Sequence, residues 1–314
     1  MSDACPLCDE TAAAFMCAKN GFDIVRCIEC GLVRVHPLPS SETLSAYYKA
    51  GYNQFVYSFA TPSSDPPLRK SPELKVLEKY CQTGTLLDVG AAHGHFMVNA
   101  QRHGWKVTGV EPQDEARTDA QSRFHLAIFE SLSETRDHDA DAVTMWHVIE
   151  HIASPLDFLR NARSKLKVGG ALALATPNVD SLVARATGES WGWLSPPDHV
   201  YLYSPKTLPR LLEQAGFDVL HVETRQGESR NFLILMLQAL AYRLGLFSRM
   251  KRSVQRAAEQ VHTTDSLTSK LNFFYVTEKV TDVLSYALYP VLIILYRKGL
   301  GDEVLAVARR KENV

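Results

Sequence analysis

The sequence lacks both a long apolar run and an excess of charge of one sign. Its longest apolar run, residues 284–296, has 13 residues and contains Pro290, whereas a helix that crosses a bilayer needs about 20 apolar residues. The 314 residues include 34 Lys and Arg against 35 Asp and Glu, so no global positive field exists to bind nucleic acid. The N-terminus lacks the basic and apolar segments of a secretory signal. These absences predict a cytoplasmic protein that does not bind nucleic acid.

Cysteine is also scarce, because six residues in a chain of this length are too few for a disulfide scaffold. Four of them form two CxxC pairs, Cys5 with Cys8 and Cys27 with Cys30, and 18 residues separate the pairs. Two such turns can surround one ion with four thiolates, so the spacing predicts a structural Zn²⁺ site. The alternatives are a redox CxxC and unligated thiols, which two matched pairs disfavour.

A strand, a glycine turn, a helix and a second strand follow one another in the middle of the chain. The strands are predicted over Thr85–Val89 and Lys106–Val110, the turn over 90–94 and the helix over 95–103. Glycines let a ligand approach the backbone, the helix N-terminus offers free N–H groups, and Glu111 after the second strand can accept ribose hydroxyl protons. The turn has neither the GxGxxG of NAD sites nor the GK[ST] of a P-loop.

The alternation of strands and helices continues downstream. We predict strands over 139–145, 171–176 and 216–222, a turn over 168–170, and helices over 159–166 and 205–215. This order predicts an α/β fold with a Rossmann-like sheet.

The turn Asp-Val-Gly-Ala-Ala-His-Gly, residues 88–94, resembles motif I of class I S-adenosylmethionine (SAM) methyltransferases. Ala92 stands where those enzymes often have a further glycine. The segments HVIEHI, LKVGG and TPN resemble the post-motif segments of the branch that includes quinone O-methyltransferases and many sugar-modifying enzymes. DHVYLYS, residues 198–204, is similar to a segment of sugar C-methyltransferases, and CxxCGLVxxxPxP…YY resembles the zinc-binding leader of the same branch.

The resemblance covers roughly residues 5–225 and the last strand, and it implies five parts. These are a zinc-binding module over 1–57, a linker over 58–72, a SAM-binding domain over 73–225, an apolar helical insertion over 226–301 and the last strand over 302–314. Class I methyltransferases end in an antiparallel hairpin, and the insertion here separates its two strands. The insertion is either a helical cap, packed on the sheet or on a second subunit, or an amphipathic element at the inner face of the membrane that admits a lipid-linked acceptor.

The resemblance also implies roles for individual residues at the SAM site. Motif I borders the amino-acid end of SAM, Glu111 holds the ribose, the residues after the third strand flank adenine, and His147 lies near the methionine moiety or the acceptor. The implied SAM-binding residues are Asp88, Gly90, Ala92, Gly94, Glu111, Pro112, Ser131, Leu132 and His147.

Two histidines are candidates for the base that takes a proton from the acceptor. A neutral imidazole is a competent base near pH 7. His199 is the first choice, because the resembling segment of sugar C-methyltransferases places its histidine beside the acceptor; Tyr201 is expected to assist by hydrogen bonding. His151 is the second candidate. The structural alternatives are a backbone-bonded His199 at a strand start and a His151 that caps its loop and pairs with Glu150.

The resemblance implies a SAM-dependent methyltransferase that also carries Zn²⁺. Its small-molecule acceptor is expected to be a hydroxyl or activated carbon of a sugar, glycolipid or polyprenyl-type metabolite. The alternatives are a quinone-type O-methyltransferase, a non-catalytic zinc protein on a methyltransferase scaffold that binds SAM or a partner, and an NAD-dependent oxidoreductase.

Overall fold

The computed structural model describes residues 4–47, 68–226 and 291–312. The chain divides into two compact units: the first comprises Met1–Pro177, Ser195–Glu223 and Val304–Val314, and the second comprises Asn178–Leu194 and Thr224–Glu303. Within the described ranges, no helix has both the length and the apolar character needed to cross a membrane. Most of the predicted linker and insertion falls outside the described residues, so their structure stays a prediction.

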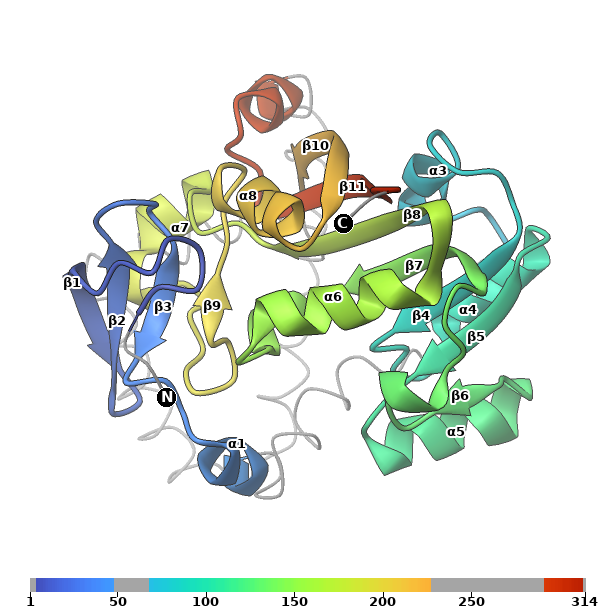
Figure 1. Cartoon of the computed structure of the whole chain (residues 1–314). Helices are drawn as coiled ribbons and strands as arrows, with labels where there is room; N and C mark the ends of the chain where they lie inside the picture. The colour runs from blue at the N-terminus through green and yellow to red at the C-terminus, as the bar shows by residue number, and fades with distance from the viewer. Residues whose placement is uncertain (1–3, 48–67, 227–290, 313–314) are drawn as a thin grey trace, which may run out of the picture. The chain divides into compact units, whose positions relative to one another are not determined.

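A seven-stranded mixed sheet forms the core of the first unit (Figure 1). Its order is β10-β11-β8-β7-β4-β5-β6. The strands are β4 (Thr85–Val89), β5 (Lys106–Val110), β6 (Ile128–Phe129), β7 (Ala140–Trp146), β8 (Leu166–Pro177), β10 (Phe217–Arg225) and β11 (Glu303–Arg310). The strand β4 pairs in parallel with β5 on one side and with β7 on the other. This arrangement confirms the predicted Rossmann-like α/β fold.

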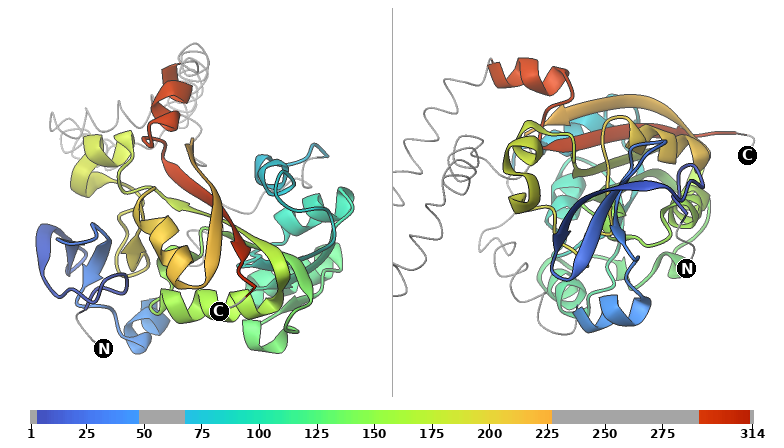
Figure 2. Two further views of the ribbon diagram at one scale, coloured as in Figure 1. Left: turned by 45° about the horizontal axis from the view of Figure 1, so that its top comes forward. Right: turned by 90° about the vertical axis from the view of Figure 1, so that its left-hand side faces the viewer.

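Helices cover both faces of this sheet. Alternate residues of each strand point to opposite faces, so apolar side chains on both faces are available to pack against helices. Leu87 and Val89 belong to a core cluster that includes residues of α6 (Pro155–Lys165) and α8 (Thr207–Gln214). Leu86 belongs to a second cluster, with residues of α3 (Pro72–Leu77) and α4 (His95–Arg102). The helix α5 (Asp114–Phe124) contributes Ala120 to a third cluster. Figure 1 and the left view of Figure 2 show the helices arranged around the strands.

Two predicted boundaries differ from the structure. The predicted turn over 168–170 is wrong, because these residues belong to β8, which begins at Leu166. Gly169 adopts φ +75° there, and the pairing of β8 with β7 shifts register between Ala140 and Ala142. The glycine pair is therefore an irregularity inside a long strand. The helix predicted over 159–166 starts earlier, at Pro155, since proline suits the first turn of a helix.

The N-terminal segment forms a small antiparallel sheet with a strand from much later in the chain. Its order is β1-β2-β3-β9, where β1 is Ala13–Lys19, β2 is Phe22–Cys27, β3 is Val33–His36 and β9 is Tyr201–Leu202. Val33 pairs with Leu202 and Arg34 pairs with Tyr201. The following helix α1 (Ser41–Tyr47) is capped by Ser40, whose Oγ accepts the Thr43 N–H at 3.1 Å. The small sheet is thus joined to the later part of the first unit through β9.

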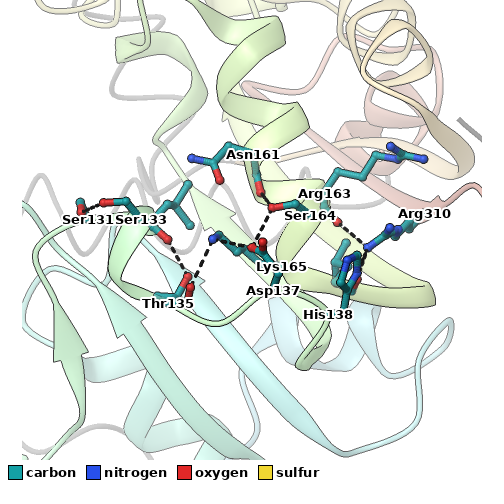
Figure 3. A network of polar contacts seen from close by, with 12 residues as sticks. Ser131, Ser133, Thr135, Asp137, His138, Asn161, Arg163, Ser164, Lys165 and Arg310 are labelled. Carbon is teal, nitrogen blue, oxygen red and sulfur yellow. Dashed lines mark hydrogen bonds and ion pairs between the residues drawn. The ribbon is translucent and has the colours of Figure 1, made fainter.

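A polar network fixes the C-terminal end of α6 against the loop that leads into β7 (Figure 3). The Lys165 ammonium donates to Asp137 Oδ1 at 2.7 Å and to the Thr135 carbonyl at 3.3 Å, and the Ser164 hydroxyl also donates to Asp137 Oδ1 at 3.1 Å. The Lys165 side chain is almost fully buried, whereas Asp137 is more than half exposed. The ammonium therefore depends on these two acceptors for the hydrogen bonds that burial takes from water.

We expect Lys165→Met to lower the free energy of unfolding by about 1 kcal/mol. Methionine keeps the apolar stem but removes the charged donor. The loss of stability is limited because the partner, Asp137, is more than half exposed and water can solvate it. Lys167→Met is the matched control, because Lys167 pairs with Asp141 at 2.8 Å on the surface and such pairs contribute about 0.2–1 kcal/mol. Urea unfolding measures both variants. Equal effects of the two substitutions would contradict a special role for the buried ammonium.

Candidate functional site

Four cysteine thiols meet in the N-terminal module. Their sulfur atoms all lie within 4.8 Å of one another, with 3.4 Å between Cys5 and Cys30 and 3.5 Å between Cys8 and Cys27. A tetrahedral zinc site with Zn–S bonds of about 2.3 Å places its sulfurs about 3.8 Å apart. The four thiols therefore fit a structural zinc ion.

The backbone around both cysteine pairs is shaped in the same way. The residue after each pair has a left-handed backbone, with φ +55° at Asp9 and +80° at Gly31. The Asp9 N–H donates to the Cys5 carbonyl at 2.9 Å, and the Gly31 N–H donates to the Cys27 carbonyl at 3.1 Å. Burial would raise the pKa of Cys27, but the backbone N–H groups of Cys30 and Glu29 outweigh it and lower the pKa to about 7. Such N–H donors stabilise a thiolate, the form that binds zinc.

The predicted SAM-binding residues lie at one edge of the main sheet. β4, β5 and β7 are parallel, so their carboxyl ends share that edge. The glycine turn follows β4, Glu111 follows β5 and His147 follows β7. Because β4 has β5 on one side and β7 on the other, this edge contains the switch point where open α/β sheets bind ligands.

The glycine turn needs its glycines for two different reasons. Gly90 and Gly94 have φ +78° and +76°, which L-residues rarely adopt. A Cβ on Gly90 would lie 2.4 Å from Val148 Cγ2, and a Cβ on Gly94 would lie 2.4 Å from Leu126 Cδ1. The Gly90 N–H donates to the Val110 carbonyl at 2.8 Å, which holds the turn against the end of β5. A side chain at either glycine would therefore have to displace Val148 or Leu126, in addition to the strain of the left-handed backbone.

Ala92 also has a left-handed backbone, with φ +45°. This is the position where the resembling enzymes often have glycine, and a left-handed L-residue costs about 1–2 kcal/mol. We expect Ala92→Gly to raise the free energy of unfolding by about 0.5 kcal/mol, since glycine relieves this strain but loses more entropy on folding. Ala91→Gly, next to it but without a positive φ, should instead destabilise by about 0.5–1 kcal/mol. Thermal unfolding of both variants tests this, and a destabilised Ala92→Gly variant would contradict the strain.

Glu111 is buried and connects β5 to the glycine turn. Its Oε2 accepts the Ala92 N–H at 2.9 Å, and its Oε1 accepts the Gln113 N–H at 2.9 Å. Burial raises the pKa of Glu111, although these two N–H groups oppose the rise. A carboxylate has about four acceptor sites, so two remain for ligand hydroxyls. The predicted ribose contact of Glu111 is compatible with this arrangement and stays a prediction.

Asp88 is fully buried at the end of β4. The Thr144 hydroxyl donates to its Oδ1 at 2.7 Å. Burial raises the pKa of Asp88 to about 7, which the Thr144 hydrogen bond opposes and the nearby Glu111 reinforces. A cationic group of a ligand at this place would stabilise the ionised form.

The remaining predicted SAM contacts differ in exposure. Leu132 is buried in the main core cluster, and Pro112 is exposed. Ser131 begins a short 3₁₀ turn, and its N–H donates to Glu134 Oε1 at 3.0 Å. His147 has a left-handed backbone with φ +56°, and its N–H donates to the Ala175 carbonyl at 2.9 Å. Their contacts with SAM stay predictions.

Three histidines and two carboxylates meet beside the glycine turn. We call them the His–carboxylate cluster: His147, Glu150, His151, Asp198 and His199. His151 Nδ1 lies 3.0 Å from Asp198 Oδ1, His199 Nε2 lies 3.7 Å from Asp198 Oδ2, and His147 Nδ1 lies 3.4 Å from Glu150 Oε1. The rings of His151 and His199 stand edge to face with centroids 4.7 Å apart.

A backbone hydrogen bond and a side-chain contact position this cluster. The Val200 N–H donates to the Glu150 carbonyl at 2.8 Å, which joins the segment after β7 to the segment before β9. Val148, next to His147, is the side chain that a Cβ on Gly90 would strike. The cluster is thus adjacent to the turn predicted to bind SAM.

The charges of the cluster are strongly coupled. Burial would lower the pKa of His151, but the Asp198 hydrogen bond and the charge of Glu150 outweigh it and raise the pKa. Burial would raise the pKa of Glu150, but His147, His151 and His199 outweigh it and lower the pKa to about 2. Imidazole and carboxylate groups therefore stabilise each other's charged forms.

The three predicted catalytic residues have different surroundings. His199 and His151 are both in the cluster. The partner of His151 is Asp198, whereas Glu150 Oε2 accepts the Thr176 hydroxyl at 2.9 Å. Tyr201 is buried, its hydroxyl donates to the Ala153 carbonyl at 3.3 Å, and burial raises its pKa to about 12. Whether these residues act on the acceptor stays a prediction.

Sequence reasoning missed Asp198, and it named Glu150 only as a structural partner of His151, whose hydrogen-bond partner is Asp198 instead. Each directly precedes a candidate histidine, in the pairs Glu150-His151 and Asp198-His199. The repeated acid–histidine pair was a usable signal. The sequence does not show that the chain folds back and brings these two pairs together.

Comparison with known sequences identifies the middle of the chain. A model of a methyltransferase domain family matches residues 66–222. Similar proteins include the ubiquinone biosynthesis O-methyltransferase of Nitrosospira multiformis, 25% identical over 193 residues, which are 54% of this chain and 80% of that protein. The protein of the same name in Caulobacter vibrioides is 30% identical over 128 residues, which are 37% of this chain and 51% of that protein.

Comparison with solved structures supports the fold. A SAM-dependent methyltransferase of Thermotoga maritima, described as a possible histamine N-methyltransferase, has a TM-score of 0.50 at 16% identity and covers 85% of this chain and 99% of its own. The [4+2]-cyclase SpnF has a TM-score of 0.51 at 17% identity and covers 88% of this chain and 98% of its own. At these identities the likeness shows the fold alone.

Proposed function

The chain belongs to the methyltransferase domain family and is a SAM-dependent methyltransferase, and we propose that its acceptor is a hydroxyl or activated carbon of a sugar, glycolipid or polyprenyl-type small molecule. The observation that supports this is the His–carboxylate cluster beside the glycine turn. Methyl transfer needs a nucleophile in line with the sulfonium methyl, a site that excludes water, and a group that takes or displaces the acceptor's proton.

The proposed division of the site follows the two neighbouring segments. Asp88, the turn 90–94 and Glu111 bind SAM, and the cluster faces the acceptor. His199 is the first candidate for the proton acceptor and His151 the second. Asp198, which lies within 3.7 Å of an imidazole nitrogen of each, orients both rings. The similarity of DHVYLYS to sugar C-methyltransferases supports a sugar acceptor.

A quinone-type phenol is the second candidate acceptor. It is favoured by the similar proteins, which are named ubiquinone biosynthesis O-methyltransferases. A phenol with a polyprenyl tail would also suit the predicted apolar insertion over 226–301. The proposed O-methyl transfer needs the same proton removal as transfer to a sugar hydroxyl.

Mass spectrometry of cell extracts incubated with the protein and methyl-labelled SAM tests the proposal. A labelled product that partitions into organic solvent supports a lipid or quinone acceptor, and a polar product supports a sugar. Heat-inactivated protein is the control. Labelled protein or nucleic acid, without a labelled small molecule, would contradict the proposed acceptor class.

A further inference from the structure

We propose that Glu150, His151 and His199 bind a divalent transition-metal ion. One ligand-type atom from each of these residues lies within 4.8 Å of the others. The three residues come from two segments that the Val200 N–H ties together. This site is distinct from the four-cysteine site, and its donors are nitrogen and oxygen.

One oxygen of the Glu150 carboxylate accepts no hydrogen bond in the described part of the chain. Glu150 is fully buried, and its Oε2 accepts the Thr176 hydroxyl. Among the described residues its Oε1 accepts no hydrogen bond; His147 Nδ1, 3.4 Å away, contacts it only as an ion pair. An unsatisfied buried acceptor costs about 1–3 kcal/mol, and more when it is charged. A bound cation would satisfy this oxygen.

The buried negative charge of the cluster also favours a bound cation. The side chains of Glu150 and Asp198 are both inaccessible to solvent, and buried carboxylates need compensating positive charge. Protonated imidazoles are one source of that charge. One divalent cation compensates both carboxylates and leaves the imidazoles neutral, which is the form that binds metals.

The hydrogen bond of His151 prepares this ring as a ligand. Its Nδ1 lies 3.0 Å from Asp198 Oδ1 and 3.2 Å from the Asp198 carbonyl oxygen, so in the neutral ring Nδ1 carries the proton and Nε2 keeps its lone pair. A carboxylate behind a histidine fixes the tautomer and strengthens the ligand. Two imidazoles and one carboxylate are a donor set used by zinc, iron and manganese sites that keep open positions.

The chemical role that we assign to this metal ion rests on the proposed function. An ion held by Glu150, His151 and His199 would lower the pKa of an acceptor hydroxyl bound to it, so that the hydroxyl would lose its proton to water. Its oxygen would then attack the methyl carbon of SAM, with the new O–C bond forming as the C–S bond breaks and leaves its electrons on sulfur. In this case His151 and His199 are ligands, and the acceptor is a hydroxyl and not a carbon.

Titration with Mn²⁺, followed by the electron paramagnetic resonance signal of the free ion, tests the site. The full-length protein is used with one zinc per chain in the four-cysteine site, confirmed by elemental analysis. Manganese prefers nitrogen and oxygen donors to thiolates, so it reports on the second site. We expect saturable binding of one Mn²⁺ per chain, with nitrogen couplings from imidazole. Absence of saturable binding, or of nitrogen coupling, would overturn the proposal.

Variants locate the bound ion. We expect Glu150→Gln and His199→Asn each to weaken Mn²⁺ binding at least tenfold, and Asp198→Asn, behind the ligand, to weaken it about 10–100-fold. Glu223→Gln and His221→Asn are the controls, because these residues form another His–carboxylate pair at 3.0 Å on β10. Circular dichroism and SAM affinity show that each variant is folded. Unchanged binding in the folded Glu150→Gln variant would overturn the proposal. No acceptor enters this measurement, so it stands or fails separately from the proposed function.

Discussion

We expect the protein to carry one zinc ion at the four-cysteine site, and Cys27→Ser to remove it, to unfold the N-terminal sheet and to lower turnover about 100-fold. Cys27 ends β2, its N–H donates to the Leu32 carbonyl at 2.9 Å, and its side chain is in the main core cluster. Structural zinc contributes about 10–16 kcal/mol in zinc-finger peptides. A sheet of short strands cannot replace a contribution of that size.

The loss of turnover follows from the strand that the two parts share. Residues of β3 pair with β9, and β9 begins two residues after His199. When β3 unfolds, β9 loses its pairing partner and the position of His199 is no longer fixed. A displacement of about 1 Å at a reacting group can cost about 100-fold in rate. The glycine turn and Glu111 follow β4 and β5, which belong to the seven-stranded sheet and are not paired with β9. The affinity for SAM should therefore be unchanged in this variant.

Zinc content, turnover and SAM calorimetry on the same protein separate these effects. Cys17→Ser and Cys81→Ser are the controls, because neither cysteine belongs to the four-cysteine cluster. Both controls should keep the zinc and the activity. A Cys27→Ser variant that loses zinc but keeps full turnover would show that the module does not position His199.

The parts of this protein that could be predicted from sequence are those with local causes. The buried strand β4, the glycine turn and the acidic residue after β5 form one continuous pattern, and the structure has them in the predicted order. The four cysteines are another local pattern, since two turns of four residues supply every ligand. The Val168–Gly170 prediction was wrong because a glycine pair is compatible both with a turn and with an irregular strand, and pairing with β7 decides between them.

The parts that could not be predicted depend on contacts between distant segments. The pairing of β3 with β9 joins residues 33–34 to residues 201–202. The hydrogen bond of His151 to Asp198 likewise joins positions 47 residues apart. No periodicity in either segment specifies its partner. The sequence therefore identified the histidines by resemblance, but not Asp198, the carboxylate that contacts both of their rings.

The second large effect is expected for His199→Ala, which should lower turnover about 100–10,000-fold, the range of general acid–base catalysis. The side chain is buried in the cluster beside His151 and Asp198. Proton transfer and metal binding both place His199 at the reacting atom of the acceptor, so either role predicts the loss. SAM affinity should stay within about twofold, because the glycine turn and Glu111 are unchanged.

The control for this variant is His221→Ala. His221 lies on β10, is partly exposed and pairs with Glu223, so its loss should leave turnover unchanged. Steady-state kinetics with labelled SAM and calorimetry of SAM binding measure both variants. Full turnover in His199→Ala would remove this residue from the reaction. A parallel loss of SAM affinity would instead mean that the cluster supports the SAM site, because a residue that acts only on the acceptor affects the chemical step without changing the affinity for the methyl donor.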